Sequence, residues 1–429
     1  MQEELGSNER KKSVKNTNAY ANFLIFACAF LYCSSMAAKG IFVAEQKYIV
    51  DLWSLQYAEA SSANTYYFVL YGITQIVLFL IMQKLNIFKY LLFTVPLAAL
   101  ATMLMGTAKD MDSICLFFGL SGLFQAGIYC GCNHFLTKYL PATFLTKANK
   151  IMNAMYAIGT VSAYAVCAFF ITWNFWRLPY FLFGGIFFLS IAVFAVAVRK
   201  CKRIEIAQQF DVDSGSTKAS KKSQQPFLLV GKKNKKLFYL FVIIFAIFIS
   251  ALYYGVMNYI TALLVDVHGF SQNSSIYVSI IAPIAITFGP MLTISSCEKN
   301  QDFVTIGFWY LLLALPIPLL LVWFYKSHVL VALALCLMFI VLAQGVKAIV
   351  LSVIPFQMRE QINVGGYSAI VNAVISISGG VTPMIVGKLI DLWGWGTAYG
   401  VIFVLTMGTV IGVFLVRVFF DYLKIPHLK

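Results

Sequence analysis

The sequence has 429 residues, of which 60% are hydrophobic and only 11% charged, and its mean hydropathy is +0.81. Soluble domains carry about 25% charged residues, so this composition excludes an ordinary soluble enzyme. The net charge of +15 does not indicate nucleic-acid binding, because the lysines and arginines stand in short clusters between apolar runs. That pattern is typical of a polytopic membrane protein.

Apolar runs of about 20 residues predict membrane-crossing helices. In chain order, the twelve predicted spans are 20–44, 62–83, 90–108, 113–137, 151–172, 178–198, 237–265, 273–296, 303–325, 329–355, 367–390 and 396–419. The first run is too long for the core of a signal peptide, so we expect it to remain as a membrane anchor.

The distribution of positive charge predicts the orientation of the chain. Twenty-five of the 32 Lys and Arg residues fall on the side of the N-terminus and five on the opposite side. Cytoplasmic loops are enriched in these residues, so both termini are expected in the cytoplasm, with the protein in an inner or plasma membrane. The two remaining cations, Lys39 and Lys347, lie inside predicted spans.

The polar segments divide the chain into two halves of six predicted helices each. We expect a cytoplasmic N-terminal tail at 1–19, a first bundle at 20–198, a basic linker at 199–236, a second bundle at 237–420 and a cytoplasmic tail at 421–429. The linker is either a regulatory segment or a solvated, positively charged loop.

A weak internal repeat supports this division. A shift of 219 residues places Gln125 on Gln344, and Asn153-Ala154 on Asn372-Ala373. Together with the linker, these matches favour two duplicated bundles around a central cavity. The predicted fold is therefore an all-α membrane protein of twelve transmembrane helices in two six-helix pseudo-repeat bundles.

This layout resembles the major facilitator superfamily over essentially the whole chain. The stretch Met82-Gln83-Lys84-Leu85 lacks the acid of the family's signature after helix 2, whereas Glu298-Lys299 keeps an acid and base pair after helix 8. In the family, the missing acid is part of a cytoplasmic latch between helices, so the resemblance does not extend to this latch.

Further motifs resemble the organophosphate:phosphate antiporter branch. They are Tyr32 and Lys39, Tyr71-Gly72-Ile73-Thr74-Gln75, Trp176-Arg177, Gly379-Gly380, and Gly387-Lys388-Leu389-Ile390-Asp391. That branch carries a cationic phosphate-binding residue in helix 1, so the resemblance implies this role for Lys39. Its second cation, in helix 7, has no counterpart here.

Acidic residues are expected only in loops and at helix ends, so neither Lys39 nor Lys347 has an obvious carboxylate partner. A charge within a span normally faces a cavity or a partner, which makes the substrate the expected counter-ion. Lys347 lies roughly 12 Å from the predicted end of its helix. Lys39 lies closer to its predicted end, so its ammonium group either enters the cavity or reaches the membrane interface.

Polar and aromatic residues in the spans complete the candidate substrate site. They are Tyr32, Tyr71, Gln75, Gln125, Tyr253, Asn258, Gln344 and Asn372. Each offers a hydroxyl or an amide to a ligand, or else bonds to a neighbouring helix. We favour Gln125 and Gln344 for the cavity, because the repeat pairs them.

His134 is the only histidine inside a predicted span, and histidine titrates in a range that suits proton coupling. A hydrogen-bonded structural role is the alternative. Cys130 and Cys132 lie beside it, but the spacing is not that of a structural metal site. We expect no metal and no cofactor.

These observations predict a secondary transporter that moves a small organic anion, a carboxylate or a phosphate ester, by alternating access, with exchange as one mode. The alternatives are a proton-coupled carrier of an amino acid, nucleoside or other polar solute, and a non-transporting sensor on the same fold. The sequence shows no nucleophile-base pair and no nucleotide-binding loop, so we do not expect an enzyme. Its partners are expected to be an anionic solute and membrane lipids, with no nucleic acid, and the chain is expected to be monomeric.

Overall fold

The computed structural model describes residues 2–81, 84–140, 142–211, 235–300, 302–357 and 364–422, and every regular element in these ranges is helical. The first half contains α1 (Gln2–Trp53), α2 (Tyr57–Ile81), α3 (Ile87–Met105), α4 (Met111–Gln125), α5 (Ile128–Tyr139), α6 (Ala142–Thr172) and α7 (Leu178–Asp211). The second half contains α8 (Lys235–Met257), α9 (Ile260–Asp266), α10 (Gln272–Ser279), α11 (Ile281–Ala285), α12 (Phe288–Asn300), α13 (Phe303–Ala314), α14 (Pro316–Phe324), α15 (Val329–Ala348), η1 (Ile349–Val353), α16 (Ile354–Gln357) and α17 (Val364–Tyr422). The all-α membrane fold is thereby confirmed.

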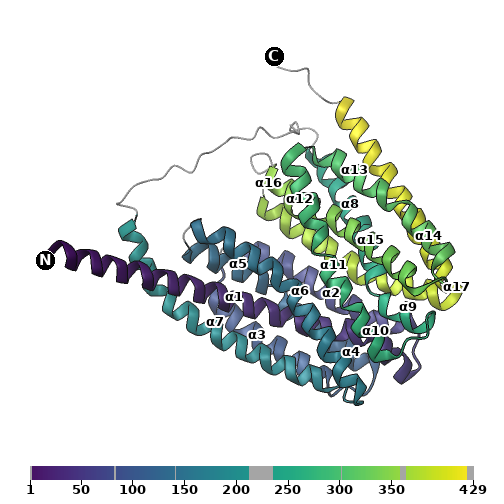
Figure 1. The fold of residues 1–429 in the computed structure, drawn as a ribbon, viewed down its shortest axis with the longest axis horizontal. Helices are drawn as coiled ribbons and strands as arrows, with labels where there is room; N and C mark the ends of the chain where they lie inside the picture. The colour runs from purple at the N-terminus through teal and green to yellow at the C-terminus, as the bar shows by residue number, and fades with distance from the viewer. Residues whose placement is uncertain are drawn as a thin grey trace.

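Eleven segments of the described chain are long and apolar enough to cross a membrane. The last of them, Gly366–Val418, has 53 residues, or roughly 80 Å of helix against a hydrocarbon core of about 30 Å. Its helix α17 is interrupted at Gly394, where φ is 80° and ψ is 175°, and the chain turns back there (Figure 1). The predicted spans 367–390 and 396–419 match the two arms of α17, while the total of twelve crossings stays a prediction.

The end of the first predicted span is wrong. The polar run that begins at Glu45 was expected to lie outside the helix, but α1 continues to Trp53. Two of its polar side chains have partners inside the protein: the Gln46 amide donates to the Ser61 hydroxyl at 2.8 Å, and the Lys47 ammonium donates to Asp51 at 2.6 Å. Such contacts let a helix keep polar residues where the hydropathy pattern predicts a break.

Two other predicted segments differ at their borders. Helix α7 continues to Asp211, into the predicted linker 199–236, whereas residues 212–234 lie outside the described residues. Met82 and Gln83 also lie outside them. The predicted span 303–325 consists of two helices, because Pro316 opens α14 with no N–H to continue the ladder of α13.

Short polar residues begin several helices. The Asp110 carboxylate accepts a hydrogen bond from the Ser113 N–H at 2.7 Å before α4, and Ser271 and Asp302 cap α10 and α13 in the same way. The bond from Ser113 holds the pKa of the Asp110 carboxyl below its usual value. These caps fix where the chain enters each span.

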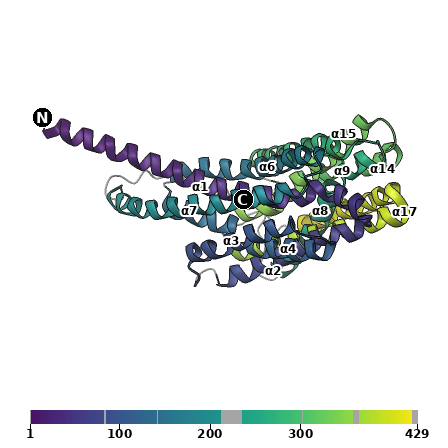
Figure 2. The same ribbon diagram turned by 90° about the horizontal axis from the view of Figure 1, so that it is seen from below.

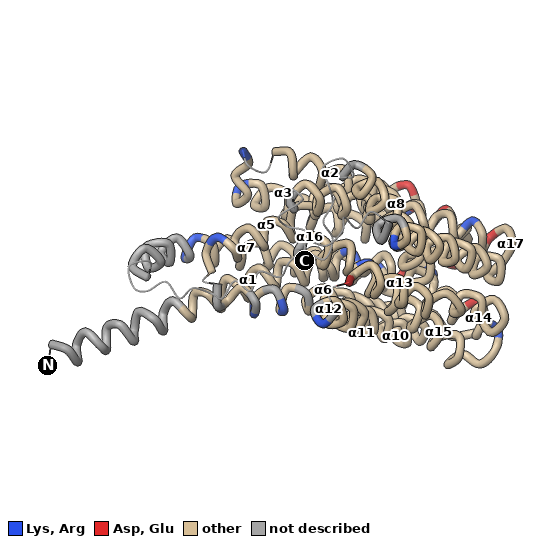
Figure 3. The backbone as a smooth tube through the Cα atoms, turned by 90° about the horizontal axis from the view of Figure 1, so that it is seen from above, with Lys and Arg blue, Asp and Glu red and all other residues tan. Residues whose placement is uncertain are grey.

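The two halves lie side by side; in Figure 1 the long helices α1 and α7 of the first half run along the picture, whereas α17 of the second half is steeply inclined to them, and Figure 2 shows the same arrangement from below. Most of the tube carries no Lys, Arg, Asp or Glu (Figure 3). Helix α2 packs closely along the first arm of α17, where glycines allow the approach. A Cβ on Gly380 would lie 2.8 Å from the Cβ of Phe68, and one on Gly387 would lie 2.8 Å from the Ala58 nitrogen, both on α2. This helix pair is a main seam between the halves.

Candidate functional site

A cavity of about 440 Å³, including its open mouth, lies between the two halves. Helices α1, α2, α6 and α8 line it, with Asn258 directly after α8; the lining residues are Met36, Lys39, Gly40, Val43, Phe68, Tyr156, Thr160, Tyr164, Tyr253, Tyr254, Met257 and Asn258. The walls are therefore mainly aromatic and apolar, with few polar groups.

Lys39 brings a positive charge into this cavity from α1. Since α1 ends at Trp53, Lys39 lies about 21 Å from that end, too far for its ammonium group to reach the interface there. Its Nζ lies 4.4 Å from the centroid of the Phe68 ring and 5.8 Å from that of Tyr67. These rings stabilise the cation by cation–π attraction.

Lys347 brings a second positive charge from the other half. It is 5% exposed, and its Nζ lies 4.0 Å from the Tyr253 ring centroid and 4.9 Å from that of Tyr254. It is not among the lining residues, but both tyrosines are. The π-helical segment η1 begins two residues later, and π-helical turns are frequent at functional sites.

The two lysines belong to one electrostatic unit. The charge of Lys39 acts on Lys347, and the Phe68 ring beside Lys39 has its centroid 5.2 Å from that of the Tyr254 ring beside Lys347. Among the described residues, neither lysine forms an ion pair; the two ion pairs found there both use Lys47. The centre of the molecule therefore holds two close, unneutralised cations, one from each half.

The other predicted site residues fall into three places. Tyr253 and Asn258 line the cavity, and the Asn258 side-chain nitrogen is buried without a hydrogen-bond partner. Gln344 lies one turn before Lys347, with its buried oxygen also unpartnered. Tyr32, Tyr71, Gln75, Gln125 and Asn372 are not among the lining residues.

Gln125 is held within the first half. Its side-chain oxygen accepts hydrogen bonds from the Ser35 hydroxyl at 2.8 Å and the Tyr67 hydroxyl at 3.3 Å, and its nitrogen donates to the Ser121 hydroxyl at 2.6 Å. This network joins α1, α2 and α4. The arrangement favours interhelical bonding over a place in the cavity wall.

His134 lies exposed on α5, with its ring 5.6 Å from that of Phe135. It is not among the residues that line the cavity.

The expectation that acidic residues occur only in loops and at helix ends is wrong, because Glu45 lies inside α1 and is 0% exposed. The misplaced end of the first span hid this carboxyl group.

Sequence reasoning also missed part of the cavity wall. Tyr156, Thr160 and Tyr164 follow one another at intervals of four on α6, and all three line the cavity. This spacing puts them on one helical face. A polar stripe of that period in an apolar span was the available signal.

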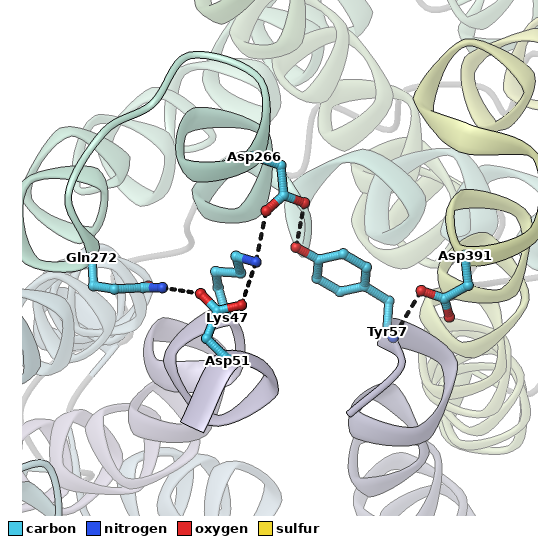
Figure 4. Close-up of polar contacts among 6 residues, drawn as sticks. All are labelled: Lys47, Asp51, Tyr57, Asp266, Gln272 and Asp391. Carbon is cyan, nitrogen blue, oxygen red and sulfur yellow. Dashed lines mark hydrogen bonds and ion pairs between the residues drawn. The ribbon is translucent and has the colours of Figure 1, made fainter. Parts of the chain in front are cut away.

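At one end of the molecule, a polar cluster joins the halves; we call it the distal cluster (Figure 4). Its six residues are Lys47, Asp51, Tyr57, Asp266, Gln272 and Asp391. The Lys47 ammonium lies 2.6 Å from both Asp51 and Asp266, the Tyr57 hydroxyl donates to Asp266 at 2.6 Å, and Gln272 donates to Asp51.

Asp391 completes the distal cluster from α17. Its carboxylate accepts hydrogen bonds from the N–H groups of Tyr57 at 3.0 Å and Ala58 at 2.9 Å, at the first turn of α2. A carboxylate at a helix N-terminus is stabilised by the free N–H groups and the helix dipole. The contacts of the distal cluster thus hold the two halves together at this end.

Three comparisons relate the chain to known proteins. A family profile described as the Major Facilitator Superfamily matches residues 25–362. A bacterial homolog to the human lysosomal transporter Spinster, in an inward-facing and unoccupied conformation, has 16% identity and a TM-score of 0.67, over 94% of this chain and 96% of that one. The nucleoside transporter NupG has 12% identity and a TM-score of 0.66, over 93% and 99%. No curated protein sequence matches the chain significantly. At these identities, the structural likeness shows the fold alone.

Proposed function

Because the chain belongs to the Major Facilitator Superfamily and is a membrane transporter of small solutes, we propose that it carries a small organic anion by alternating access. The observation that supports this proposal is the pair of unneutralised lysines, Lys39 and Lys347, one from each half. A buried charge is costly unless it is paired. An anion between the two ammonium groups supplies the missing partner.

The same pair links binding to closure of the cavity. Two like charges repel as the halves approach, and a bound anion replaces that repulsion with attraction to both lysines. Carriage of a solute then follows from rocking of the halves around a central site. In this proposal the closed distal cluster leaves the cavity accessible from the opposite side of the membrane, which we expect from the distribution of Lys and Arg to be the cytoplasmic side.

The walls indicate the body of the anion. Phe68, Tyr156, Tyr164 and Tyr254 offer rings, and Met36 offers a flexible apolar side chain. A small inorganic ion would leave these groups without contacts, whereas a flat or apolar body would bury them. We propose an organic anion with an aromatic or apolar body and one acidic group, bound by a monomeric carrier in an inner or plasma membrane.

A nucleoside is the second candidate, supported by the aromatic walls and by Asn258. The unpartnered amide of Asn258 could bond to a base edge while the tyrosines stack on its face. In that case, the lysines would contribute little to binding.

A thermal-shift screen of the purified protein in detergent tests both candidates. The probes are benzoate, phenyl phosphate, succinate and uridine, added to the parent, to Lys347→Ala and to the control Lys326→Ala at an exposed loop lysine. We expect benzoate or phenyl phosphate to raise the unfolding temperature of the parent and the control but not of Lys347→Ala. Stabilisation by uridine alone, equal in all three proteins, would contradict the anion proposal.

A further inference from the structure

Four cations stand at the end of the first half opposite the distal cluster, and we call them the basic cluster. They are Lys147 and Lys150 on α6 and Arg199 and Lys200 on α7, and all four are exposed. The membrane-crossing segments of these two helices are Lys150–Thr172 and Leu178–Lys200, and that of α1 begins at Asn18. The basic cluster therefore lies where three helices leave the hydrocarbon core, at the level of the lipid head groups.

Two of these lysines are held against α1. The Lys147 ammonium donates to the Asn22 side-chain oxygen at 2.9 Å, and the Lys200 Nζ lies 5.7 Å from the centroid of the Phe23 ring. Asn22 and Phe23 are consecutive, so α6 and α7 bring their cations to one level of α1. An ammonium group has three N–H donors. Lys147 uses one of them on a described residue and Lys200 contacts a ring face, so both keep donors for an anion.

No described carboxylate neutralises the basic cluster. Between residues 18 and 200, the acidic residues are Glu45, Asp51, Glu59, Asp110 and Asp112, in the far part of α1, the first turn of α2 and the start of α4. Figure 3 shows the same separation, with blue segments and no red ones in the described chain beside the α7 label. The two ion pairs among the described residues both belong to the distal cluster. The counter-charge of the basic cluster is therefore expected from outside this part of the chain.

The neighbouring surface is apolar toward the membrane. Phe26 lies one turn further into the membrane than Asn22 on α1, is 58% exposed, and stacks on Phe30 with ring centroids 5.9 Å apart. On α7, Val196 lies one turn further in than Lys200 and is 45% exposed. Residues four apart share a helix face. Both contacts with α1 thus continue into an exposed apolar face, which suits a molecule with an anionic head and hydrocarbon chains.

We propose that the basic cluster binds the phosphate group of an anionic phospholipid, whose acyl chains lie along the faces of α1 and α7 that carry Phe26 and Val196. Basic pockets between membrane-spanning helices on the cytoplasmic side bind such head groups, and the distribution of Lys and Arg makes this the expected cytoplasmic end. A zwitterionic lipid lacks the net charge that four cations attract. The inference is independent of the solute, because none of these residues lines the cavity.

A lipid bound there acts on the first half as a whole. A phosphate that accepts hydrogen bonds from Lys147 and Lys200 ties α6 and α7 to each other across α1, which both lysines already contact. Alternating access requires each half to move largely as a rigid body. Because the lipid joins three helices of one half, it stabilises the folded protein, and thermal unfolding measures its binding.

The test is thermal unfolding of the purified protein in a neutral detergent, with phosphatidylglycerol added in increasing amounts. Phosphatidylcholine with the same acyl chains is the control lipid. We expect phosphatidylglycerol alone to raise the unfolding temperature of the parent. In the double variant Lys147→Ala with Lys200→Ala, the concentration that gives half of the rise should be roughly 30-fold higher, since each lysine near an anionic surface contributes roughly a fivefold gain in binding.

Lys84→Ala with Lys89→Ala is the matched control, because it removes two exposed lysines at the start of α3, at the same end of the first half. It should respond to phosphatidylglycerol as the parent does. So should Lys147→Arg with Lys200→Arg, which keeps both charges, and Lys347→Ala, which changes only the proposed solute site. Native mass spectrometry counts bound lipid independently of stability, and the parent should retain a phosphatidylglycerol that the Lys147→Ala and Lys200→Ala variant loses.

Three results would overturn the inference, and each leaves the proposed function untouched. Equal shifts with phosphatidylglycerol and phosphatidylcholine, or no shift with either, would show that the protein does not recognise an anionic head group. An equal loss of the response in the two alanine double variants would assign it to net charge and not to this site. Stabilisation by glycerol phosphate at the same concentration as by phosphatidylglycerol would mean that the ligand is a free phosphate ester and not a lipid.

Discussion

Lysines inside the helices of this protein have two kinds of surroundings, carboxylates at the distal cluster and aromatic rings at the cavity. Lys47 of the distal cluster lies 2.6 Å from each of two carboxylates, one on its own helix and one from the other half. Lys39 and Lys347 at the cavity lie over aromatic rings and form no ion pair with a described residue. The paired lysine joins the halves, whereas the unpaired lysines are the ones that we propose to bind the solute.

The comparison also separates stability from transport. Breaking a partly buried ion pair leaves a carboxylate without its partner, so changes in the distal cluster should alter the conformational balance. Removing an unpaired cation relieves a cost instead. Changes at the cavity should therefore reduce transport without unfolding the protein, and four predictions examine this division.

The largest expected effect is that of Lys347→Ala. Truncation of one partner of a buried charged contact costs about 2 to 5 kcal/mol, so uptake of the anion should fall roughly 30-fold or more. The thermal unfolding temperature should stay the same or rise, because the substitution removes an unpaired charge. Uptake into proteoliposomes and unfolding in detergent measure the two quantities. Unimpaired uptake would show that Lys347 does not bind the anion.

The next effect is a contrast at Lys39. Lys39→Arg keeps the cation and should retain uptake within about threefold, while Lys39→Gln should lose roughly tenfold, since a hydrogen bond to a charged group contributes about 1.5 to 3 kcal/mol. Concentration dependence of uptake separates binding from turnover. Equal activity of the two variants would argue that the charge of Lys39 is irrelevant and that only its shape matters.

The third prediction concerns the paired lysine, Lys47, and its partner Asp266 in the distal cluster. Asp266→Asn removes the carboxylate that binds Lys47 and Tyr57. Because this carboxylate is partly exposed, we expect its contacts to stabilise the closed distal end by about 1 to 2 kcal/mol. Amide hydrogen exchange at the start of α10 should become roughly tenfold faster as the distal end opens more often.

Asp302→Asn is the control for this change, because Asp302 caps α13 and is not a member of the distal cluster. It should leave exchange at α10 as in the parent. Unchanged exchange in Asp266→Asn would mean that helix packing alone holds the distal end closed, and the role given to Lys47 would be lost.

The sequence predicted that the chain consists of apolar helices and that Lys39 and Lys347 lie inside them, for one physical reason. A bilayer imposes a length and a polarity on each helix, so apolar runs and isolated charges such as Lys347 are visible without tertiary information. Glu45 was missed because its polar neighbours Gln46 and Lys47 imitate a loop in a hydropathy pattern. Their partners, Ser61 and Asp266, are distant in sequence.

The cavity wall was harder to predict than the charges. A tyrosine in a span either lines a cavity or packs between helices, and the relative rotation of helices decides which. Tyr156 lines the cavity, whereas Tyr67 bonds to Gln125 inside the first half. The repeat pairs Gln125 with Gln344, but the two side chains have different surroundings. Gln125 forms hydrogen bonds to neighbouring helices, whereas the Gln344 oxygen has no hydrogen-bond partner.

The last prediction concerns the α2–α17 seam that carries the distal cluster. A Cβ on Gly387 would lie 2.5 Å from the Tyr259 hydroxyl and 2.8 Å from the Ala58 nitrogen, and the backbone of α2 cannot yield without moving Asp391 away from its helix N-terminus. Gly387→Ala should therefore lower stability by about 1 to 3 kcal/mol through overpacking and open the distal end. Gly400→Ala, which would meet nothing within 4 Å, should be neutral or stabilise by up to about 1 kcal/mol. Apparent unfolding temperatures of the two variants measure the contrast, and α10 exchange shows whether it reaches the distal end. If Gly387→Ala behaves like Gly400→Ala, the seam tolerates a wider helix spacing, and the polar contacts of Lys47 and Asp391 hold the halves together without close packing.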